Sequence, residues 1–191
     1  IARCVQKLRV ALRDKLLLVT FCTKAEGGEQ ALSHKEYLAF LHLILDTDCA
    51  DLLDIEFFTA GADLPLLVEQ AHTAGVPVVC SSHDFAKTPP RAELVERMVQ
   101  MQQAGADLPK LAVMPQSRTD VLELLAATAE MAEHHPETPV ITMSMGTLGA
   151  VSRLAGEAFG SAMTFANPGQ ASAPGQVSLE VVNEVLDALH L

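Results

Sequence analysis

The sequence predicts an α/β fold in which helices cover a parallel sheet. Short apolar runs of strand length alternate along the chain with longer segments whose apolar residues recur at helical spacing. The apolar runs are continuous, as expected of strands that helices cover on both faces. This alternation gives six strand–helix units preceded by one helix. Both an open doubly wound sheet and part of an eight-unit barrel fit the pattern.

The first half of the chain contains clear start and stop signals. Residues 1–13 have helical periodicity, and residues 15–21 form a strand rich in Leu, Val and Thr. Ser33 followed by Glu36 predicts a capping box for a helix through residue 45. The next strand is expected at 52–58, followed by a helix at 64–74 that Gly75 ends.

The second half continues the alternation. Pro89 and Pro90 precede a helix that ends at Gly105, and Ser178 begins the last helix, which has an apolar face. Further strands are expected at residues 76–82, 110–114, 140–145 and 162–166, and further helices at 119–134 and 149–158.

The composition favours one soluble domain. A chain of 191 residues is long enough for a single core, so residues 1–191 are expected to form one domain. The net charge of −11 argues against nucleic acid as a partner, and no apolar run is long enough to suggest a membrane partner. Four cysteines with no Cys-x-x-Cys pair favour reduced thiols in a cytoplasmic protein.

Lys110 and His83 are the main candidates for catalysis. Lys110 lies in an apolar strand, where a charged ammonium is costly, and His83 follows another strand of the expected sheet. A neutral lysine amine can attack a carbonyl, and a histidine can move the protons. The alternative for each residue alone is ordinary: a lysine that reaches solvent from a strand end, and a histidine that caps a loop.

Four further polar residues follow expected strands. Glu26 could orient a histidine ring, or it could be a solvated loop carboxylate. Arg153 could bind a substrate carboxylate with its guanidinium fork, or it could be an exposed helix residue. Ser172 and Gln176 could belong to a lid that binds a polyol, or to a simple connector.

These residues resemble the type I 3-dehydroquinate dehydratases in order and spacing over nearly the whole chain. The matching segments are Glu26-Gly27-Gly28-Glu29-Gln30, Ser82-His83-Asp84-Phe85, Lys110 within 109–116, residues 141–153, and residues 171–176. The resemblance implies a (β/α)8 TIM barrel, here truncated to its last six strand–helix units. It also implies a homodimer and no metal or organic cofactor.

The resemblance implies a hydro-lyase that converts 3-dehydroquinate to 3-dehydroshikimate and water in the shikimate pathway of aromatic amino acid biosynthesis. Lys110 corresponds to the lysine that forms a Schiff base with the C3 ketone of the substrate. His83 corresponds to the histidine that removes a C2 proton and assists loss of the C1 hydroxyl. Glu26 corresponds to the carboxylate that pairs with this histidine.

The resemblance also assigns the binding residues. Arg153 corresponds to the arginine that holds the substrate carboxylate. Ser172 and Gln176 correspond to the closing loop that contacts substrate hydroxyls. Met143 and Met145 correspond to apolar packing near the imine.

The sequence departs from the family pattern in two places. The family has two further strand–helix units before the first strand seen here, and Cys22 stands where the family usually has an arginine. Two alternatives therefore accompany the dehydratase hypothesis. One is a catalytically impaired remnant that only binds a ligand or a partner, and the other is a different Schiff-base aldolase on the same fold.

Overall fold

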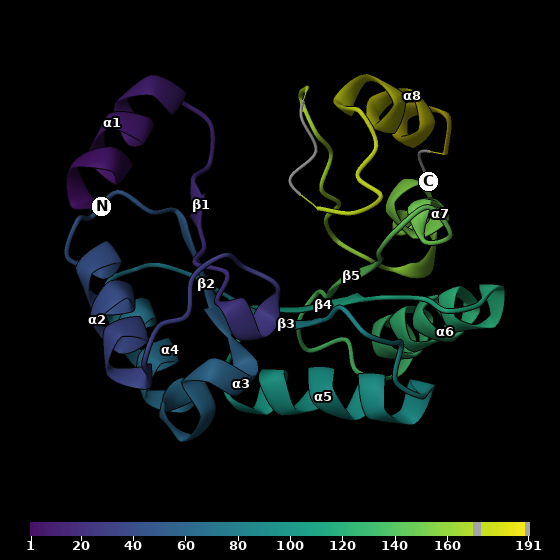
Figure 1. Cartoon of the computed structure of the whole chain (residues 1–191), viewed down its shortest axis with the longest axis horizontal. Helices are drawn as coiled ribbons and strands as arrows, with labels where there is room; N and C mark the ends of the chain where they lie inside the picture. The colour runs from purple at the N-terminus through teal and green to yellow at the C-terminus, as the bar shows by residue number, and fades with distance from the viewer. Residues whose placement is uncertain (170–172, 190–191) are drawn as a thin grey trace. The chain divides into compact units, whose positions relative to one another are not determined.

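The protein has an α/β fold in which every strand pairing with a defined register is parallel (Figure 1). The computed structural model describes residues 1–169 and 173–189. The five strands that it describes follow their chain order, β1-β2-β3-β4-β5. The chain divides into two compact units: unit 1 is Ile1–Ser82 with Gln103–Asp107, and unit 2 is His83–Gln102 with Leu108–Leu191. The prediction of a parallel sheet with alternating helices is confirmed.

Unit 1 contains the first three parallel strands and the helices between them. Leu18 pairs with Leu52, and Leu53 pairs with Val78, which places β2 between β1 and β3. The elements are α1 (Ala2–Leu12), β1 (Leu18–Val19), the 3₁₀ turn η1 (Lys24–Glu26), α2 (His34–Leu45), β2 (Leu52–Glu56), α3 (Phe57–Ala60), η2 (Gly61–Asp63), α4 (Leu64–Thr73) and β3 (Val78–Asp84, of which His83 and Asp84 belong to unit 2).

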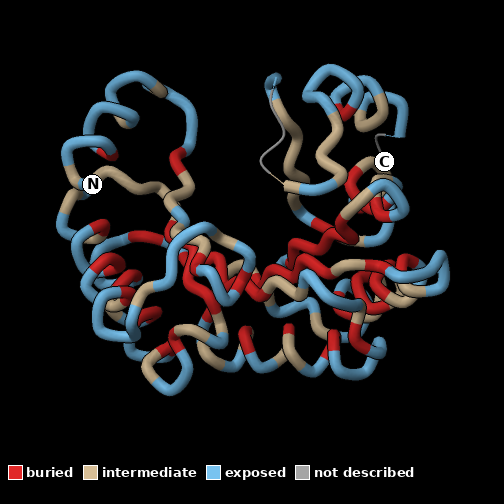
Figure 2. Tube along the Cα trace, viewed as in Figure 1, coloured by how far each residue is buried: buried red, intermediate tan, exposed pale blue. Residues whose placement is uncertain are grey.

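Unit 2 contains two further parallel strands, in which Lys110 pairs with Ile141. Figure 2 shows that β4 and β5 are buried along most of their length, and α6 and α7 both pack on β5. The elements are α5 (Arg91–Gln103, of which Gln103 belongs to unit 1), β4 (Leu108–Val113), α6 (Arg118–His134), β5 (Ile141–Ser144), α7 (Ala150–Leu154), η3 (Glu157–Phe159) and α8 (Leu179–Leu189).

Three helices begin at serines whose hydroxyls accept backbone amides. Ser33 and Glu36 form the predicted capping box, in which the Glu36 carboxylate accepts the Ser33 amide at 2.8 Å. Ser117 and Asp120 form a second capping box, so α6 begins one residue earlier than expected. Ser178 accepts the amide three residues later at 3.4 Å, which confirms the predicted start of α8.

The prediction of a strand at residues 162–166 is wrong. Only an isolated bridge between Val140 and Ser161 precedes this segment. The Thr142 amide donates to the Ser161 hydroxyl at 3.1 Å, where a continuing strand would offer a main-chain carbonyl. Because this ladder position is taken by a side chain, the pairing stops after one bridge.

Several other expected elements are shorter in the structure, among them the strand expected at 52–58, which ends at Glu56 where α3 begins. The strand expected at 15–21 is reduced to β1. Just before it, the Leu17 amide donates to the Asp51 carboxylate at 2.6 Å, while the Leu17 carbonyl oxygen accepts the Asp51 and Leu52 amides. The helix expected at 149–158 is reduced to α7, and η3 follows it. A Cβ at Gly156 would lie 2.5 Å from the carbonyl oxygen of Ser152, so glycine is needed where the chain leaves α7.

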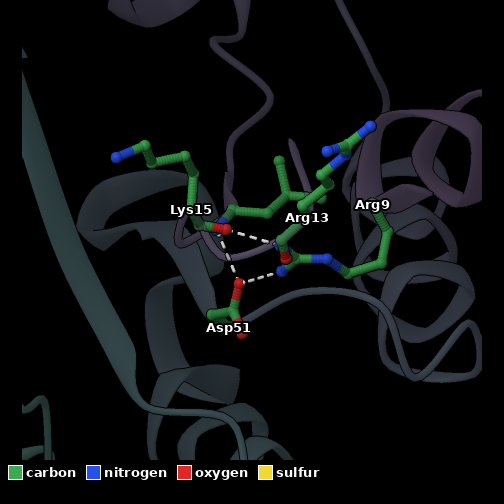
Figure 3. A network of polar contacts seen from close by, with 5 residues as sticks. Arg9, Arg13, Lys15 and Asp51 are labelled. Atoms are coloured by element: carbon green, nitrogen blue, oxygen red, sulfur yellow. Dashed lines mark hydrogen bonds and ion pairs between the residues drawn. The ribbon is translucent and has the colours of Figure 1, made fainter. Parts of the chain in front are cut away.

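A polar network around Asp51 fastens α1 to the start of β1 (Figure 3). The Asp51 carboxylate accepts the Arg9 guanidinium and the Leu17 amide. The same guanidinium donates to the carbonyl oxygens of Arg13, at 2.7 Å, and Lys15. The Leu17 amide first, and Arg9 in addition, hold the pKa of the Asp51 carboxyl below its usual value.

We expect Asp51→Asn to lower the urea midpoint at pH 7. The carboxylate has a lowered pKa in the folded state, so its contribution is fully present above the unfolded value of 3.8 and is lost as the pH falls through the folded value. The difference between the wild type and this variant should therefore shrink as the pH falls below about 4. Urea titrations across this range check it, with Asp14→Asn as the control. An equal difference at every pH would contradict the prediction.

Candidate active site

Lys110 is a buried amine within a strand of unit 2. It is the third residue of β4 and is 7% exposed. The Nζ atom lies over the Phe165 ring, 5.2 Å from the ring centroid. Because side chains alternate along a strand, Lys110 shares a face with Ala112 while Leu111 and Val113 point to the other face. The lysine is thus built into the sheet and does not simply reach into solvent from a strand end.

Arg153 is a buried guanidinium in α7 and is only 2% exposed. Nη1 contacts Met143 Sδ at 3.3 Å and the Phe165 carbonyl oxygen at 3.5 Å, and Nη2 donates to the Pro174 carbonyl oxygen at 3.4 Å. Nε is buried and has no hydrogen-bond partner among the residues that the structure describes. Burial lowers the pKa of the Arg153 guanidinium.

The contacts of Arg153 are too weak to explain a buried charge by themselves. Both carbonyl contacts are at the long limit of a hydrogen bond, and thioether sulfur is a poor acceptor. A buried guanidinium normally has a carboxylate or phosphate partner. Removing its charge from water costs several kcal/mol, and the attraction within a strong ion pair is of about the same size. This arrangement is suited to receiving an anionic group from a ligand.

The segment that carries Gln176 is held close to Arg153 within unit 2. The Gly146 amide donates to the Pro174 carbonyl oxygen at 3.2 Å, and Asn167 Nδ2 donates to the Gln176 carbonyl oxygen at 3.3 Å. Gly175 has φ of 75°, and a Cβ there would lie 2.3 Å from the Gly146 carbonyl oxygen. Only glycine fits this approach. Ser172, the other predicted loop residue, lies outside the described residues.

His83 lies near the carboxyl end of β3, as predicted, and is partly exposed. Its ring stacks against Phe85 with the centroids 6.4 Å apart. The chain turns after it, because the Asp84 carboxylate accepts the amides of Ala86 and Lys87 at 2.9 and 3.0 Å. The Met114 amide donates to the Asp84 carbonyl oxygen at 2.9 Å, which ties the ends of β3 and β4 together. His83 is thus positioned by backbone and accessible to a ligand.

In unit 1, Glu26 is a buried carboxylate, 3% exposed, at the end of η1. Two glycines make this turn possible. Gly27 has φ of 91°, and a Cβ at Gly28 would lie 1.8 Å from the Cys22 carbonyl oxygen. The Cys22 thiol in turn donates to the Glu26 carbonyl oxygen at 3.0 Å.

Glu56 holds the residue from which η1 begins. Its carboxylate accepts the Thr23 amide and the Thr23 hydroxyl, both at 2.7 Å, and the Thr59 hydroxyl at 2.6 Å. The Glu56 amide donates to the buried Tyr37 hydroxyl at 2.7 Å, which anchors α2 to the end of β2. The turn that carries Glu26 therefore rests on a buried and fully bonded carboxylate.

Asp54 adds a further buried carboxylate to unit 1 and accepts the Ser81 hydroxyl. Burial, and to a smaller extent the carboxylates of Asp54 and Glu26, raise the pKa of the Cys80 thiol. Such a concentration of negative charge favours the protonated form of a basic group placed beside it.

The structure thus brings Lys110 and Arg153 into contact with one residue, Phe165, which the sequence reasoning did not single out. The available signal was slight: Phe165 is one of seven phenylalanines, in a chain with only 4% aromatic residues. Asp54 was missed as well, because a single aspartate in an apolar strand has no motif around it.

Within the described part of the chain, no cluster of three or more His, Cys, Asp or Glu side chains could hold a metal ion. The same residues include no helix both long and apolar enough to cross a membrane. None of the four cysteines is in a disulfide.

Comparison with known proteins identifies the family of the chain. The family model of type I 3-dehydroquinase matches residues 1–191. The 3-dehydroquinate dehydratase of Salmonella agona (strain SL483) is 49% identical over 183 residues, which are 96% of this chain and 73% of that protein.

Solved structures of the same name superimpose on nearly the whole chain. The type I enzyme from Clostridium difficile, solved with covalently modified comenic acid, has a TM-score of 0.94 and 46% identity over 98% of this chain and 74% of that one. The enzyme from Enterococcus faecalis has a TM-score of 0.92 and 42% identity over 100% of this chain and 76% of that one.

The fold is an α/β fold with a parallel sheet, and a buried lysine lies in its fourth strand. The chain belongs to the type I 3-dehydroquinase family. The expected fold, a TIM barrel present in part, is confirmed by the solved relatives.

We expect Gly28→Ala to disrupt the turn that carries Glu26. The new methyl group would meet the Cys22 carbonyl oxygen, and such overpacking lowers the free energy of unfolding by about 1–3 kcal/mol. Urea unfolding and steady-state kinetics should both show a loss. Gly169→Ala is the control, since a Cβ there meets nothing within 4 Å. Equal losses in the two variants would contradict the prediction.

Proposed function

We propose that this chain acts as a 3-dehydroquinate dehydratase, a hydro-lyase of the shikimate pathway that works through a lysine Schiff base. The observation that carries the proposal is the buried Lys110 amine, which lies over the Phe165 ring. The same residue contacts the buried Arg153 guanidinium, whose Nε has no partner among the described residues. Membership of the family and 49% identity to a named dehydratase support it, and they do not favour a non-catalytic remnant.

The reaction follows from the amine of Lys110. In its neutral form Nζ attacks the C3 carbonyl carbon of the substrate, a C–N bond forms, and the carbonyl oxygen leaves as water with added protons. The product is an iminium, which withdraws electrons and acidifies the adjacent C2–H. We propose that His83 takes this proton, and that the electron pair passes to nitrogen to give an enamine.

The remaining steps return the enzyme to its resting state. The electron pair of the enamine moves back and expels the C1 hydroxyl, which receives a proton from His83 and leaves as water. Water then hydrolyses the iminium to 3-dehydroshikimate and restores the lysine. In this scheme Glu26 assists His83, because a carboxylate fixes the orientation of an imidazole and stabilises its charged form.

We assign substrate binding to three residues. Arg153 holds the substrate carboxylate, because its Nε is buried without a partner among the described residues. Gln176 and Ser172 bind the substrate hydroxyls, as the family resemblance implies. Gln176 follows Pro174, whose carbonyl oxygen accepts Arg153 Nη2, so the two binding groups belong to one small region of unit 2.

We further propose that residues 1–191 form a single, partial barrel domain and that the protein works as a cytoplasmic homodimer with neither nucleic acid nor membrane as a partner. The four cysteines without disulfides fit a reducing compartment, and the net charge of −11 repels nucleic acid. Light scattering after size exclusion measures the assembly state, and a monomeric mass would contradict the dimer.

We expect Lys110→Ala to abolish the covalent intermediate and His83→Ala to retain it. Borohydride reduces an iminium to a stable amine, so intact mass after addition of 3-dehydroquinate and borohydride reports the intermediate. Lys110→Ala should show no adduct and no turnover. His83→Ala should show the adduct with turnover lowered by about 10²–10⁴, the usual contribution of general acid–base catalysis. Lys87→Ala, at an exposed position, is the control. Unchanged turnover in Lys110→Ala would overturn the assignment.

We expect Arg153→Lys to raise KM much more than it lowers kcat. An ammonium keeps the charge but loses the planar fork that matches a carboxylate. The loss of one charged hydrogen bond costs about 1.5–3 kcal/mol, so KM should rise about tenfold to a hundredfold. Steady-state kinetics with 3-dehydroquinate test this, and Arg91→Lys on the exposed surface is the control. An unchanged KM would mean that the carboxylate binds elsewhere.

A further inference from the structure

Phe165 is the residue that links the two buried cations of unit 2. Its ring face lies 5.2 Å from Lys110 Nζ, within the range of about 6 Å over which a ring attracts a cation. Its carbonyl oxygen accepts Arg153 Nη1 at 3.5 Å. The side chain and the backbone of Phe165 therefore contact different groups. The ring lies against the Lys110 nitrogen, and the carbonyl oxygen contacts the Arg153 guanidinium.

We propose that the face of the Phe165 ring stabilises the nitrogen of the Lys110 imine in its cationic, iminium form. The inference rests on the proposed function and extends it by one residue. An aromatic ring carries partial negative charge on its faces, so it attracts a cation and gives little to a neutral amine or a neutral imine. Only the cationic imine withdraws electrons strongly enough to acidify the adjacent C–H.

The ring should contribute more to an iminium than to an ammonium at the same position. An ammonium has three N–H donors, and water or polar groups can satisfy them. An iminium has one N–H, and the substrate itself covers the nitrogen and excludes water. A ring therefore contributes more to the iminium, since cation–π attraction is stronger for a desolvated cation. Its removal should lower the amount of iminium relative to the other bound forms.

The geometry also separates this role from substrate binding. Arg153 contacts the carbonyl oxygen of Phe165, which every side-chain substitution keeps. Affinity for the substrate carboxylate should then stay nearly constant in variants of the ring. A ring that merely fills space would behave differently, because an apolar side chain of similar size would replace it.

The test is a graded weakening of the ring face. Phenylalanines with one, two, three and five fluorines are incorporated at position 165 alone, because fluorine withdraws charge from the ring face with little change of shape. The measured quantity is the initial rate of borohydride trapping on Lys110 at saturating 3-dehydroquinate and limiting borohydride, followed by intact mass. This rate reports the population of iminium.

We expect the trapping rate to fall stepwise with each added fluorine. Phe165→Leu should lower it about tenfold and Phe165→Tyr should keep it near the wild-type value, because only the leucine lacks a ring. The alkaline fall of kcat should move to lower pH along the series, since an iminium without the ring loses its proton more readily. The dissociation constant of the substrate should change less than twofold, which is roughly the variation expected between variants that lose no substrate contact.

Two controls separate the failure of this inference from that of the proposed function. Phe159→Leu makes the same change at the partly exposed end of η3 and should behave as wild type. If wild-type protein forms no adduct on Lys110, both the proposed function and this inference are overturned. If it forms the adduct and the fluorinated series is flat, the proposed function stands and the role of Phe165 is overturned.

Discussion

The burial of two cations in one compact unit is the constraint on which the rest of the site depends. Lys110 and Arg153 are both nearly excluded from solvent; Lys110 Nζ lies over the Phe165 ring, and Arg153 contacts two carbonyl oxygens and a sulfur. Removing charges from water is expensive, so stability alone does not account for the arrangement. A substrate carboxylate can pair with the Arg153 guanidinium and a substrate ketone can react with the Lys110 amine, so the arrangement is understood as preparation for binding.

The irregular backbone of unit 2 follows from the same constraint. Residues 162–166 read as a strand in the sequence, yet the Phe165 carbonyl oxygen turns to Arg153 and the Ser161 hydroxyl takes a ladder position. Pro174 likewise presents its carbonyl oxygen to both Arg153 and Gly146. A regular strand would have used these groups in pairing. The backbone is irregular here because its carbonyl oxygens contact the Arg153 guanidinium and not a neighbouring strand.

The sequence predicted those features that local chemistry determines. The capping box of Ser33 and Glu36, the positions of most helices and the placement of Lys110 and His83 in strands were all readable, because they depend on residues near in sequence. The support of Thr23 by Glu56 and the ring of Phe165 over Lys110 join residues 33 and 55 positions apart. No local pattern encodes such contacts, so neither could be foreseen. The Leu17 amide, just before β1, is likewise bonded to the distant Asp51 carboxylate.

The most direct test of the account is a crystal structure of the protein after reaction with 3-dehydroquinate and borohydride. The electron density is expected to be continuous from Lys110 Nζ to the substrate ring. The substrate carboxylate is expected to lie against the Arg153 guanidinium, with the Phe165 ring over the new C–N bond. Reduction at another lysine, or a carboxylate bound away from Arg153, would contradict the claim that these two buried cations form the substrate site.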